Sequence, residues 1–405
     1  MQTAQGAPRT LSSYGPNAVS IWNEIATNTI NVAPAATGTP EERRPVYTND
    51  LATVHVAIYD AVIAIAGTHK PFATTPTTPA AGASMDAAAG AAAYGVLRAL
   101  FPSRGALYQG AYDSFVAAIP DGEAKSRGLT LGAEVAAATV ALRANDGRSV
   151  VLPPYVPGTE PGQFRGTNPV NTYAPYIRPF VMTSTAQFRP DGPNALTSAE
   201  YAADVNETRD WGGATSSLRS AAQTELARFH TEPPPRFWPR NLRWFMTTSP
   251  ELAENARLAA LIWVAQSDAL NACFEAKYHY QFWRPFSAIR LADTDGNPAT
   301  SADPTWTPTV PTPNHPEYPA AHGCGSGAAA ESLRQFYGTK KINFQIDSTV
   351  TGTVRHYDST DAMVDDAQMA RIFGGMHFRT STVHGIVLGT KAAKLVARER
   401  FGGRD

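Results

Sequence analysis

The sequence predicts an all-α protein, which we expect to consist of two packed four-helix bundles with long proline-rich loops. Apolar residues recur at spacings of three and four over alanine-rich segments, the pattern of amphipathic helices. Several of these segments end at glycine or proline, the residues that close helices. The chain shows no internal repeat with a period of about 20–50 residues, which excludes solenoids and propellers.

The amino-acid composition argues against several classes of protein. With 405 residues, of which 43% are hydrophobic and 17% charged, the chain can bury a large core. Its 34 basic and 35 acidic residues nearly balance, so nucleic acid is not an expected partner. We expect no membrane span, because no apolar run approaches the roughly 20 residues that cross a bilayer. The N-terminus lacks the pattern of an export signal, so the chain is expected to be cytoplasmic, or secreted or periplasmic if a signal was removed.

Residues 1–150 are expected to form an N-terminal helical part. The helical pattern is visible in NAVSIWNEIATNTI, NDLATVHVAIYDAVIAIAG, MDAAAGAAAYGVLRALFP and GEAKSRGLTLGAEVAAATVALRANDG. Their small alanine faces let helices approach closely, which favours a bundle. Residues 151–195 are rich in proline, glycine and asparagine and are expected to form a connection that wraps over the surface.

Residues 196–405 are expected to form a C-terminal helical part that carries the functional site. Its first helix has the spacing of a capping box at Thr197 and Glu200. Helices are expected to continue through SSLRSAAQTELARFH, PRNLRWFM and a long run that ends near Arg290.

A proline- and threonine-rich loop over residues 291–320 separates this run from the next helix. The segment INFQIDSTVTGTVRHYDST is expected to form a small hairpin. Two helices over residues 363–376 and 378–399 are expected to close the chain.

Three basic segments carry the candidate chemistry, and the first is AKYHYQFWRPFSAIR. Lys277 and Arg284 are seven positions apart, so on one helix they would leave the same face about 10 Å apart. Pro285 disfavours helical geometry at Arg284. The aromatic residues around both cations predict burial, and a buried cation needs an anionic partner.

The second segment, PNHPEYPAAHGCGSG, contains His315 and His322. His322 is predicted to lie near the N-terminus of an alanine-rich helix, where free N–H groups and the helix dipole attract anions. The same dipole lowers the pKa of a histidine and keeps the ring available as a base. A lone loop histidine is more often a structural hydrogen-bonding residue, so this segment alone assigns no role.

The third segment is ARIFGGMHFRTSTVHG. Arg371 and His377 are six positions apart and would face different ways on a continuous helix. Gly374 and Gly375 allow the backbone to break between them. We therefore expect one helix to end near Phe373 and His377 to open the next.

Together the three segments offer one Lys, two Arg and two His side chains, and the tightest sequence windows around them contain no acidic residue. This inventory suits a compact tetrahedral oxyanion such as phosphate or vanadate. Two cysteines, Cys273 and Cys324, lie close to these segments in sequence. Two buried thiols or a single disulfide would both fit the sequence.

In order and in internal spacing, the segments resemble a signature shared by the vanadium-dependent haloperoxidases and the type 2 phosphatidic acid phosphatase superfamily. That signature is Lys-x6-Arg-Pro, then Pro-Ser-Gly-His, then Arg-x5-His. In this chain it reads Lys277…Arg284-Pro285, Pro319-Ala320-Ala321-His322 and Arg371…His377. The helical first half is also similar to bacterial haloperoxidase-type proteins, so the resemblance implies one haloperoxidase-like unit over residues 1–405.

The resemblance implies a role for each matched residue. His377 would be the metal ligand, and His322 would be the acid/base. Lys277 and His315 would also be catalytic. The residues that would bind the vanadate cofactor are Lys277, Arg284, Ala321, His322, Arg371 and His377, and phosphate would fit the same site.

The implied activity is oxidation of a halide by hydrogen peroxide to hypohalous acid, which then reacts with a small organic acceptor. Members of the bromide-oxidising type resemble this chain in having histidine at the position of His315, whereas the fungal chloride-oxidising type has phenylalanine. Bromide is therefore the favoured halide. A helical face of the chain could support a homodimer.

Two departures from the signature bear on the alternatives. Ala320 replaces the serine, which removes one hydrogen-bond donor worth about 1.5–3 kcal/mol. Ser381 stands where the phosphatases usually have aspartate, so we expect His377 to lack a carboxylate that orients it. This counts against an acid phosphatase-type phosphomonoesterase with His377 as the nucleophile. A non-catalytic oxyanion-binding protein is the other alternative.

Overall fold

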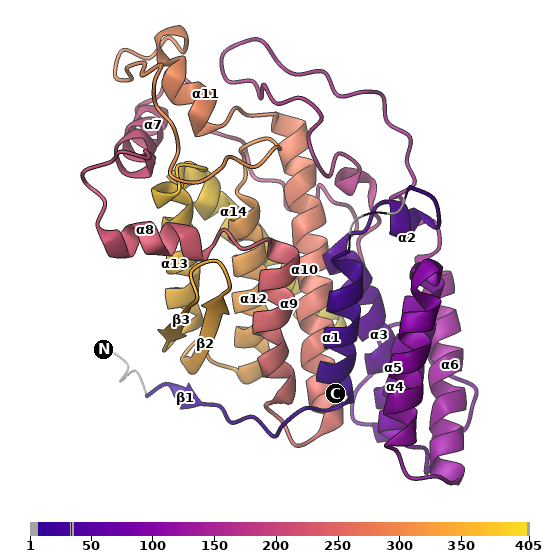
Figure 1. The fold of residues 1–405 in the computed structure, drawn as a ribbon. Helices are drawn as coiled ribbons and strands as arrows, with labels where there is room; N and C mark the ends of the chain where they lie inside the picture. The colour runs from indigo at the N-terminus through magenta and orange to yellow at the C-terminus, as the bar shows by residue number, and fades with distance from the viewer. Residues whose placement is uncertain (1–6, 33, 35, 403–405) are drawn as a thin grey trace. The chain divides into compact units, whose positions relative to one another are not determined.

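The computed structural model describes residues 7–32, 34 and 36–402 (Figure 1). The described chain is mostly helical and has one small three-stranded sheet, which confirms the all-α prediction. It divides into two compact units. The first comprises Met1–Thr10, Val150–Glu232 and Asp268–Ala393, and the second comprises Leu11–Ser149, Pro233–Ser267 and Lys394–Asp405. The expected boundaries at residues 150 and 195 stay a prediction.

The second unit is built from helices whose alanine and glycine faces pack closely. They are α1 (Ala18–Ile30), α2 (Pro40–Arg43), α3 (Tyr47–Ala66), α4 (Met85–Leu100), α5 (Gly105–Ala117), α6 (Glu123–Arg143), α9 (Pro234–Arg243) and the first half of α10 (Leu252–Tyr280). Figure 1 shows α4 and α6 side by side. A Cβ added at Gly132 of α6 would lie 2.2 Å from the carbonyl oxygen of Ala88 in α4. The close approach predicted for the alanine-rich segments is therefore present.

One helix of this unit, α3, is long and apolar enough to cross a membrane by length and composition. However, 83% of its most apolar window is buried inside the chain. The imidazole of His55 in this helix hydrogen-bonds the side-chain amide of Asn23 at 3.0 Å. The core helix of a folded domain passes the same length test, so the expected absence of a membrane span stays a prediction.

The first unit holds the remaining elements. Its helices are α7 (Ala199–Gly212), α8 (Ala221–Phe229), the second half of α10, α11 (Pro285–Arg290), α12 (Ala321–Tyr337), α13 (Thr360–Phe373) and most of α14 (Arg379–Arg400). Its strands are β1 (Arg9–Thr10), β2 (Ile342–Ser348) and β3 (Thr353–Tyr357). Strands β2 and β3 form the expected antiparallel hairpin, while the parallel pairing of β1 with β2 was not expected.

Helix boundaries around the basic segments follow the local chemistry. Helix α13 ends at Phe373, and α14 begins at Arg379, close to the positions predicted. Gly375 has a φ of 72°, so the break falls at the glycine pair as expected. His377 lies in the turn between the two helices rather than in the first turn of α14.

Two other boundary predictions were wrong. The long helix α10 ends at Tyr280 and not near Arg290, because Gln281 takes a left-handed φ of 48°. The N-cap of α7 is Ser198, whose hydroxyl accepts the amide of Tyr201, so Thr197 and Glu200 do not form the capping box. Serine and threonine are both good caps, so the pattern alone placed the cap one residue early. Helix α5 was not predicted, because its sequence contains two glycines and lacks a side-chain cap.

Helices α12 and α14 approach each other through small residues next to the basic segments. A Cβ added at Gly385 would lie 2.5 Å from the carbonyl oxygen of Ala320, and one at Gly389 would lie 2.0 Å from that of Cys324. The start of α12 is therefore held tightly against α14. Cys273 and Cys324 are both buried free thiols, so the disulfide alternative does not hold in this structure.

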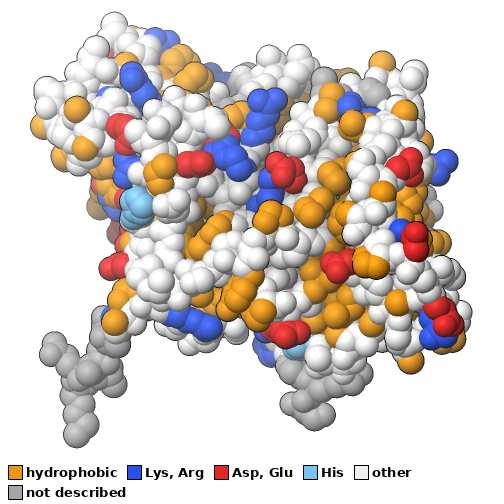
Figure 2. Space-filling view, turned by 60° about the horizontal axis from the view of Figure 1, so that its bottom comes forward, with side chains coloured by type: hydrophobic (Ala, Val, Ile, Leu, Met, Phe, Trp, Pro, Cys, Tyr) orange, Lys and Arg blue, Asp and Glu red, His pale blue; other side chains and the backbone are white. Residues whose placement is uncertain are grey.

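Charged side chains of both signs are interspersed with apolar ones on the face drawn in Figure 2. This distribution agrees with the formal net charge of −1. It offers no broad basic surface on that face of the kind that binds nucleic acid.

Candidate oxyanion-binding site

Lys277 lies in the last turn of α10 and is fully buried. Its ammonium donates to the backbone oxygens of Pro316 at 2.8 Å and Glu317 at 2.9 Å. A lysine ammonium has three hydrogens, so one remains to donate elsewhere. Burial lowers the pKa of Lys277 to about 8. The loop that follows residue 291 is thus tied directly to this cation.

Arg284 is the N-cap of α11 and has extended backbone with ψ of 156°, as the following proline requires. It does not share a helix with Lys277. Its side chain is 2% exposed and donates from Nε to the His315 backbone oxygen at 2.8 Å. Nη1 contacts the Met376 carbonyl oxygen at 2.9 Å and Nε2 of His377 at 3.0 Å. The two cations therefore converge through a turn and not along a helix face. Burial lowers the pKa of Arg284 to about 10.

His315 lies against Arg284 in the proline-rich loop. Its Nδ1 is 2.9 Å from Nη2 of Arg284, and its ring packs edge-on against Phe274 with centroids 5.2 Å apart. Burial, and then the charges of Arg284 and Lys277, lower the pKa of His315 well below its ordinary value. The ring is therefore neutral and able to accept a hydrogen bond from the guanidinium.

His322 is the second residue of α12, and Arg371 lies in the last turn of α13. Nη1 of Arg371 is 3.3 Å from Nδ1 of His322, and Nη2 donates to the His230 carbonyl oxygen at 2.8 Å. His322 is partly exposed, whereas Arg371 is 1% exposed. Burial lowers the pKa of Arg371 to about 9, and partial burial and the Arg371 charge lower that of His322 well below its ordinary value. His322 can therefore meet solvent as a neutral base.

His377 joins the two halves of the cluster and is 2% exposed. Its Nε2 faces Arg284, while Nδ1 lies 2.8 Å from Oε1 of Glu317. The preceding residue, Met376, accepts from Arg284 through its carbonyl and has its sulfur 3.9 Å from Nη1 of Arg371. Burial, and then the charges of Arg284 and Lys277, lower the pKa of His377 well below its ordinary value.

Sequence reasoning missed Glu317, which stands between His315 and His322 but outside the tightest motif windows. Its carboxylate is fully buried. Oε1 lies 2.8 Å from Nδ1 of His377 and accepts a hydrogen bond from the Phe378 amide at 3.0 Å. Burial raises the pKa of Glu317 to about 7. The expectation that His377 lacks a carboxylate beside it was therefore wrong. The partner comes from the loop before α12 and not from position 381. In the sequence, the glutamate within the segment PNHPEYPAAH was the feature that could have indicated this carboxylate.

His230 was also missed, because nothing in the sequence near it marks a site. It lies just after α8 and contributes its carbonyl oxygen to Arg371. Only the fold brings this residue to the third basic segment, 141 positions further along the chain.

The charges of the cluster do not cancel. Lys277, Arg284 and Arg371 are buried, and within the part of the chain that the structure describes none of them forms a salt bridge. The one carboxylate in contact with the cluster is Glu317 among the described residues, against three cations. A buried cation is costly without a counter-ion. The cluster therefore favours binding of an anion.

Hydrogen-bond donors next to these cations could bind a tetrahedral oxyanion. Nε of Arg371 is buried and has no hydrogen-bond partner among the described residues. Helix α12 starts at Ala321, and its N-cap Ala320 supplies no side-chain cap, so the first amides of the helix have no side-chain acceptor there. Backbone N–H groups at a helix N-terminus next to arginines form a standard anion-binding arrangement.

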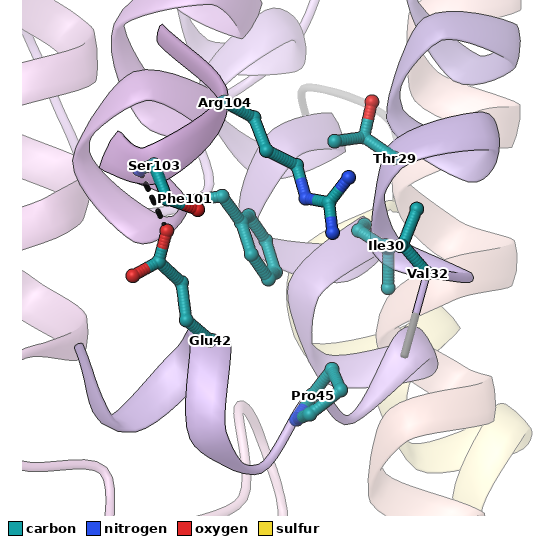
Figure 3. Close-up of a pocket in the computed structure, with 8 residues that line it drawn as sticks. All are labelled: Thr29, Ile30, Val32, Glu42, Pro45, Phe101, Ser103 and Arg104. Atoms are coloured by element: carbon teal, nitrogen blue, oxygen red, sulfur yellow. Dashed lines mark hydrogen bonds between the residues drawn. The ribbon is translucent and has the colours of Figure 1, made fainter. Parts of the chain in front are cut away.

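A separate small pocket lies in the second unit (Figure 3). Arg104 and the carboxylate of Glu42 line it, and the amide of Ser103 donates to Glu42 at 2.7 Å. Its other lining residues are Thr29, Ile30, Val32, Pro45 and Phe101. None of the residues of the basic cluster lines this pocket, so it is not the candidate site.

Comparisons with known proteins point to one group. Residues 257–401 match the family described as the VCPO second helical-bundle domain, and this range contains all the signature residues. A curated relative, the vanadium chloroperoxidase of Curvularia inaequalis, is 27% identical over 90% of this chain and 79% of its own length.

Solved structures share the fold. The first bacterial vanadium-dependent iodoperoxidase superposes with a TM-score of 0.72 at 22% identity, over 95% of both chains. The holo-type bacterial vanadium-dependent chloroperoxidase superposes with a TM-score of 0.70 at 15% identity, over 98% of both chains. The domain match and the curated relative show that the chain is similar to vanadium chloroperoxidase, and the solved structures show that it shares the fold of bacterial vanadium-dependent iodo- and chloroperoxidases.

Proposed function

We propose that the chain is a vanadate-dependent haloperoxidase that oxidises a halide, with bromide favoured, using hydrogen peroxide. The observation that carries the proposal is the buried cluster of three cations around His377, with Glu317 as the carboxylate that contacts it. Its net positive charge suits an oxyanion. The relatives named above are a chloroperoxidase and an iodoperoxidase, which supports halide oxidation without selecting bromide.

Each residue has a role in this proposal. Lys277, Arg284 and Arg371 would hold the vanadate oxygens, together with the first amides of α12 at Ala321 and His322. Nε2 of His377 would be the metal ligand. When bound, vanadate supplies a Lewis-acid centre that activates hydrogen peroxide.

His322 is the proposed acid/base. It is neutral and partly exposed, so it can take a proton from incoming hydrogen peroxide and return it to the departing oxygen. Lys277 keeps one hydrogen for a donor role at the oxidant. Hypohalous acid would then leave the site and react with a small organic acceptor.

Bromide preference is proposed on His315, whose ring contacts the guanidinium of Arg284. The test compares chloride, bromide and iodide with vanadate-loaded protein, hydrogen peroxide and a phenol dye that changes colour on halogenation. Of bromide and chloride, bromide should give the higher kcat/KM. A His315→Phe variant should lose bromide turnover selectively. Absence of turnover with all three halides would refute the haloperoxidase proposal, and faster chloride turnover would refute the preference alone.

One contact in the structure supports a second candidate function, that of a phosphomonoesterase. Glu317 contacts Nδ1 of His377, so a carboxylate is present that could orient this histidine as the nucleophile of a phosphomonoesterase, although position 381 holds serine. A chromogenic phosphate ester separates the two, because vanadate should inhibit a phosphatase and activate a peroxidase. Binding of vanadate or phosphate without turnover of either substrate would leave a non-catalytic oxyanion-binding protein.

A further inference from the structure

Glu317 holds the side of His377 that faces away from the guanidinium. Oε1 of Glu317 lies 2.8 Å from Nδ1 of His377 and also accepts the amide of Phe378 at 3.0 Å. The other side of the same imidazole, Nε2, lies 3.0 Å from Nη1 of Arg284. Each ring nitrogen of His377 thus has one defined partner.

The two partners fix where the proton sits. An arginine guanidinium can only donate, so the contact of Arg284 with Nε2 is a hydrogen bond only when Nε2 presents its lone pair. Oε1 of Glu317 already accepts the Phe378 amide, so this oxygen is an acceptor for Nδ1 as well. A neutral imidazole carries one N–H. The contacts therefore place that hydrogen on Nδ1 and leave Nε2 as the free ligand atom.

Glu317 is itself held rigidly. Its amide donates to the Phe282 carbonyl at 2.9 Å, and its own carbonyl accepts from Lys277 at 2.9 Å. The side chain is fully buried. One residue therefore connects the end of α10, the loop before α12 and the turn before α14, which are the three segments that supply the cluster.

We propose that Glu317 is a positioning residue that selects the Nδ1–H tautomer of His377 and aims Nε2 at the oxyanion site. The role of Nε2 as a vanadium ligand rests on the proposed function. The tautomer itself does not, because it follows from contacts within the chain. Carboxylates in this position behind a metal-ligating histidine typically change metal affinity about 10–100-fold when removed.

The competing explanation is that Glu317 only balances the charge of the nearby cations. The two explanations differ for Glu317→Gln and Glu317→Met. Glutamine keeps an oxygen that can accept from His377 Nδ1 but removes the charge, whereas methionine of similar length removes both. A positioning role predicts that the tautomer survives in E317Q and is lost in E317M, while a charge-balancing role predicts an equal effect of both variants on anion binding and none on the tautomer.

The first measurement is a nitrogen-15 NMR correlation of the histidine rings in protein without vanadate, with the His377 signals assigned by comparison with His377→Asn. Protonated Nδ1 and bare Nε2 are expected in the wild type and in E317Q, and a shift toward protonated Nε2 in E317M. A wild-type signal with protonated Nε2 would overturn the proposal, and so would an unchanged tautomer in E317M. If E317M fails to fold, Glu317→Ala takes its place, because alanine also removes the acceptor for Nδ1 and the same tautomer shift is expected.

The second measurement is the vanadate Kd by equilibrium dialysis, with Glu331→Gln as the matched control. Glu331 is a buried carboxylate of α12 that bonds Arg334 and Gln335 on its own helix. The Kd should rise about 100-fold in E317M, less in E317Q, and stay within about twofold in E331Q. Equal Kd values for E317M and wild type would contradict the positioning role. If the wild type bound no vanadate, the proposed function would fail while the tautomer result would stand.

Discussion

Nη1 of Arg284 lies 3.0 Å from Nε2 of His377, although 93 positions of sequence separate them. The contact is possible because two helices end in the right places: α10 stops at Tyr280 and α13 stops at Phe373. Both residues therefore sit in turns, where their side chains can meet. This pair is the centre of the candidate site.

Replacing Arg284 with lysine should weaken vanadate binding although the charge is kept. Arg284 uses three nitrogens to contact backbone oxygens and both neighbouring histidines. A lysine ammonium cannot reproduce this fork. We expect the vanadate Kd of R284K to rise about 10–100-fold, the size of one or two lost charge-assisted hydrogen bonds.

The control for this variant is Arg398→Lys. The side chain of Arg398 is 71% exposed and pairs with its sequence neighbour Glu399. R398K should bind vanadate with a Kd within about twofold of the wild type. Wild-type affinity in R284K would show that the fork geometry does not matter.

The contribution of Lys277 to anion binding should disappear at high pH. Burial lowers its pKa to about 8 in the site without anion, from 10.5 for an ordinary lysine. Below about pH 8 the ammonium is present and attracts the anion, and above it the amine is neutral. Binding above this pH must take up a proton, so the wild-type Kd should rise with pH.

The measurement is the ratio of the Kd of Lys277→Met to that of the wild type across the pH range. The ratio cancels the titration of vanadate itself. It should be about tenfold or more on the acid side of pH 8 and should fall toward one on the alkaline side. A ratio that stays constant through this window would contradict the lowered pKa.

Restoring serine at position 320 should strengthen the site. Ala320 is the N-cap of α12, is fully buried and provides no side-chain cap. A serine hydroxyl would cap the helix and add one donor for the anion. We expect A320S to lower the vanadate Kd about tenfold and to raise the free energy of unfolding by about 1 kcal/mol. Calorimetric titration and denaturant unfolding test the two effects separately, and an unchanged or weaker Kd would contradict the first.

Replacing Gly389 with alanine should destabilise the unit that carries the site. The added Cβ would lie 2.0 Å from the Cys324 carbonyl oxygen, so α12 and α14 would have to separate. We expect a loss of about 1–3 kcal/mol in the free energy of unfolding. Gly110 in α5 has open space at its Cβ position, so G110A should instead stabilise by about 0.5–1 kcal/mol. Equal effects of the two variants would show that the close contact is unimportant.

The sequence predicted the helical fold well because alanine-rich amphipathic patterns and glycine stops act locally. The break between α13 and α14 was predicted because two consecutive glycines mark it. The end of α10 was missed because Gln281 adopts a left-handed φ that glutamine rarely takes, and its carbonyl accepts the amide of the sequence-distant Phe164. Pairing of β1 with β2 joins residues more than 300 positions apart, and no local signal encodes such a contact.

The three cations of the site were predicted from the spacing within the motifs and from the family resemblance, whereas its carboxylate was not predicted. Lys277, Arg284 and Arg371 stand in the three marked segments, and the structure brings all three into one buried cluster. Glu317 was overlooked because a glutamate in a proline-rich loop usually faces solvent. Only the fold shows that its side chain turns inward to His377.

Vanadium content after loading, measured together with halide oxidation, tests the central claim most directly. Wild-type protein dialysed against vanadate should retain about one vanadium per chain, as expected for a single ligand histidine. It should then oxidise bromide with hydrogen peroxide. The His377→Ala variant should fold, lose the vanadium and show no turnover. Stoichiometric vanadium and undiminished bromide oxidation in that variant would contradict the account.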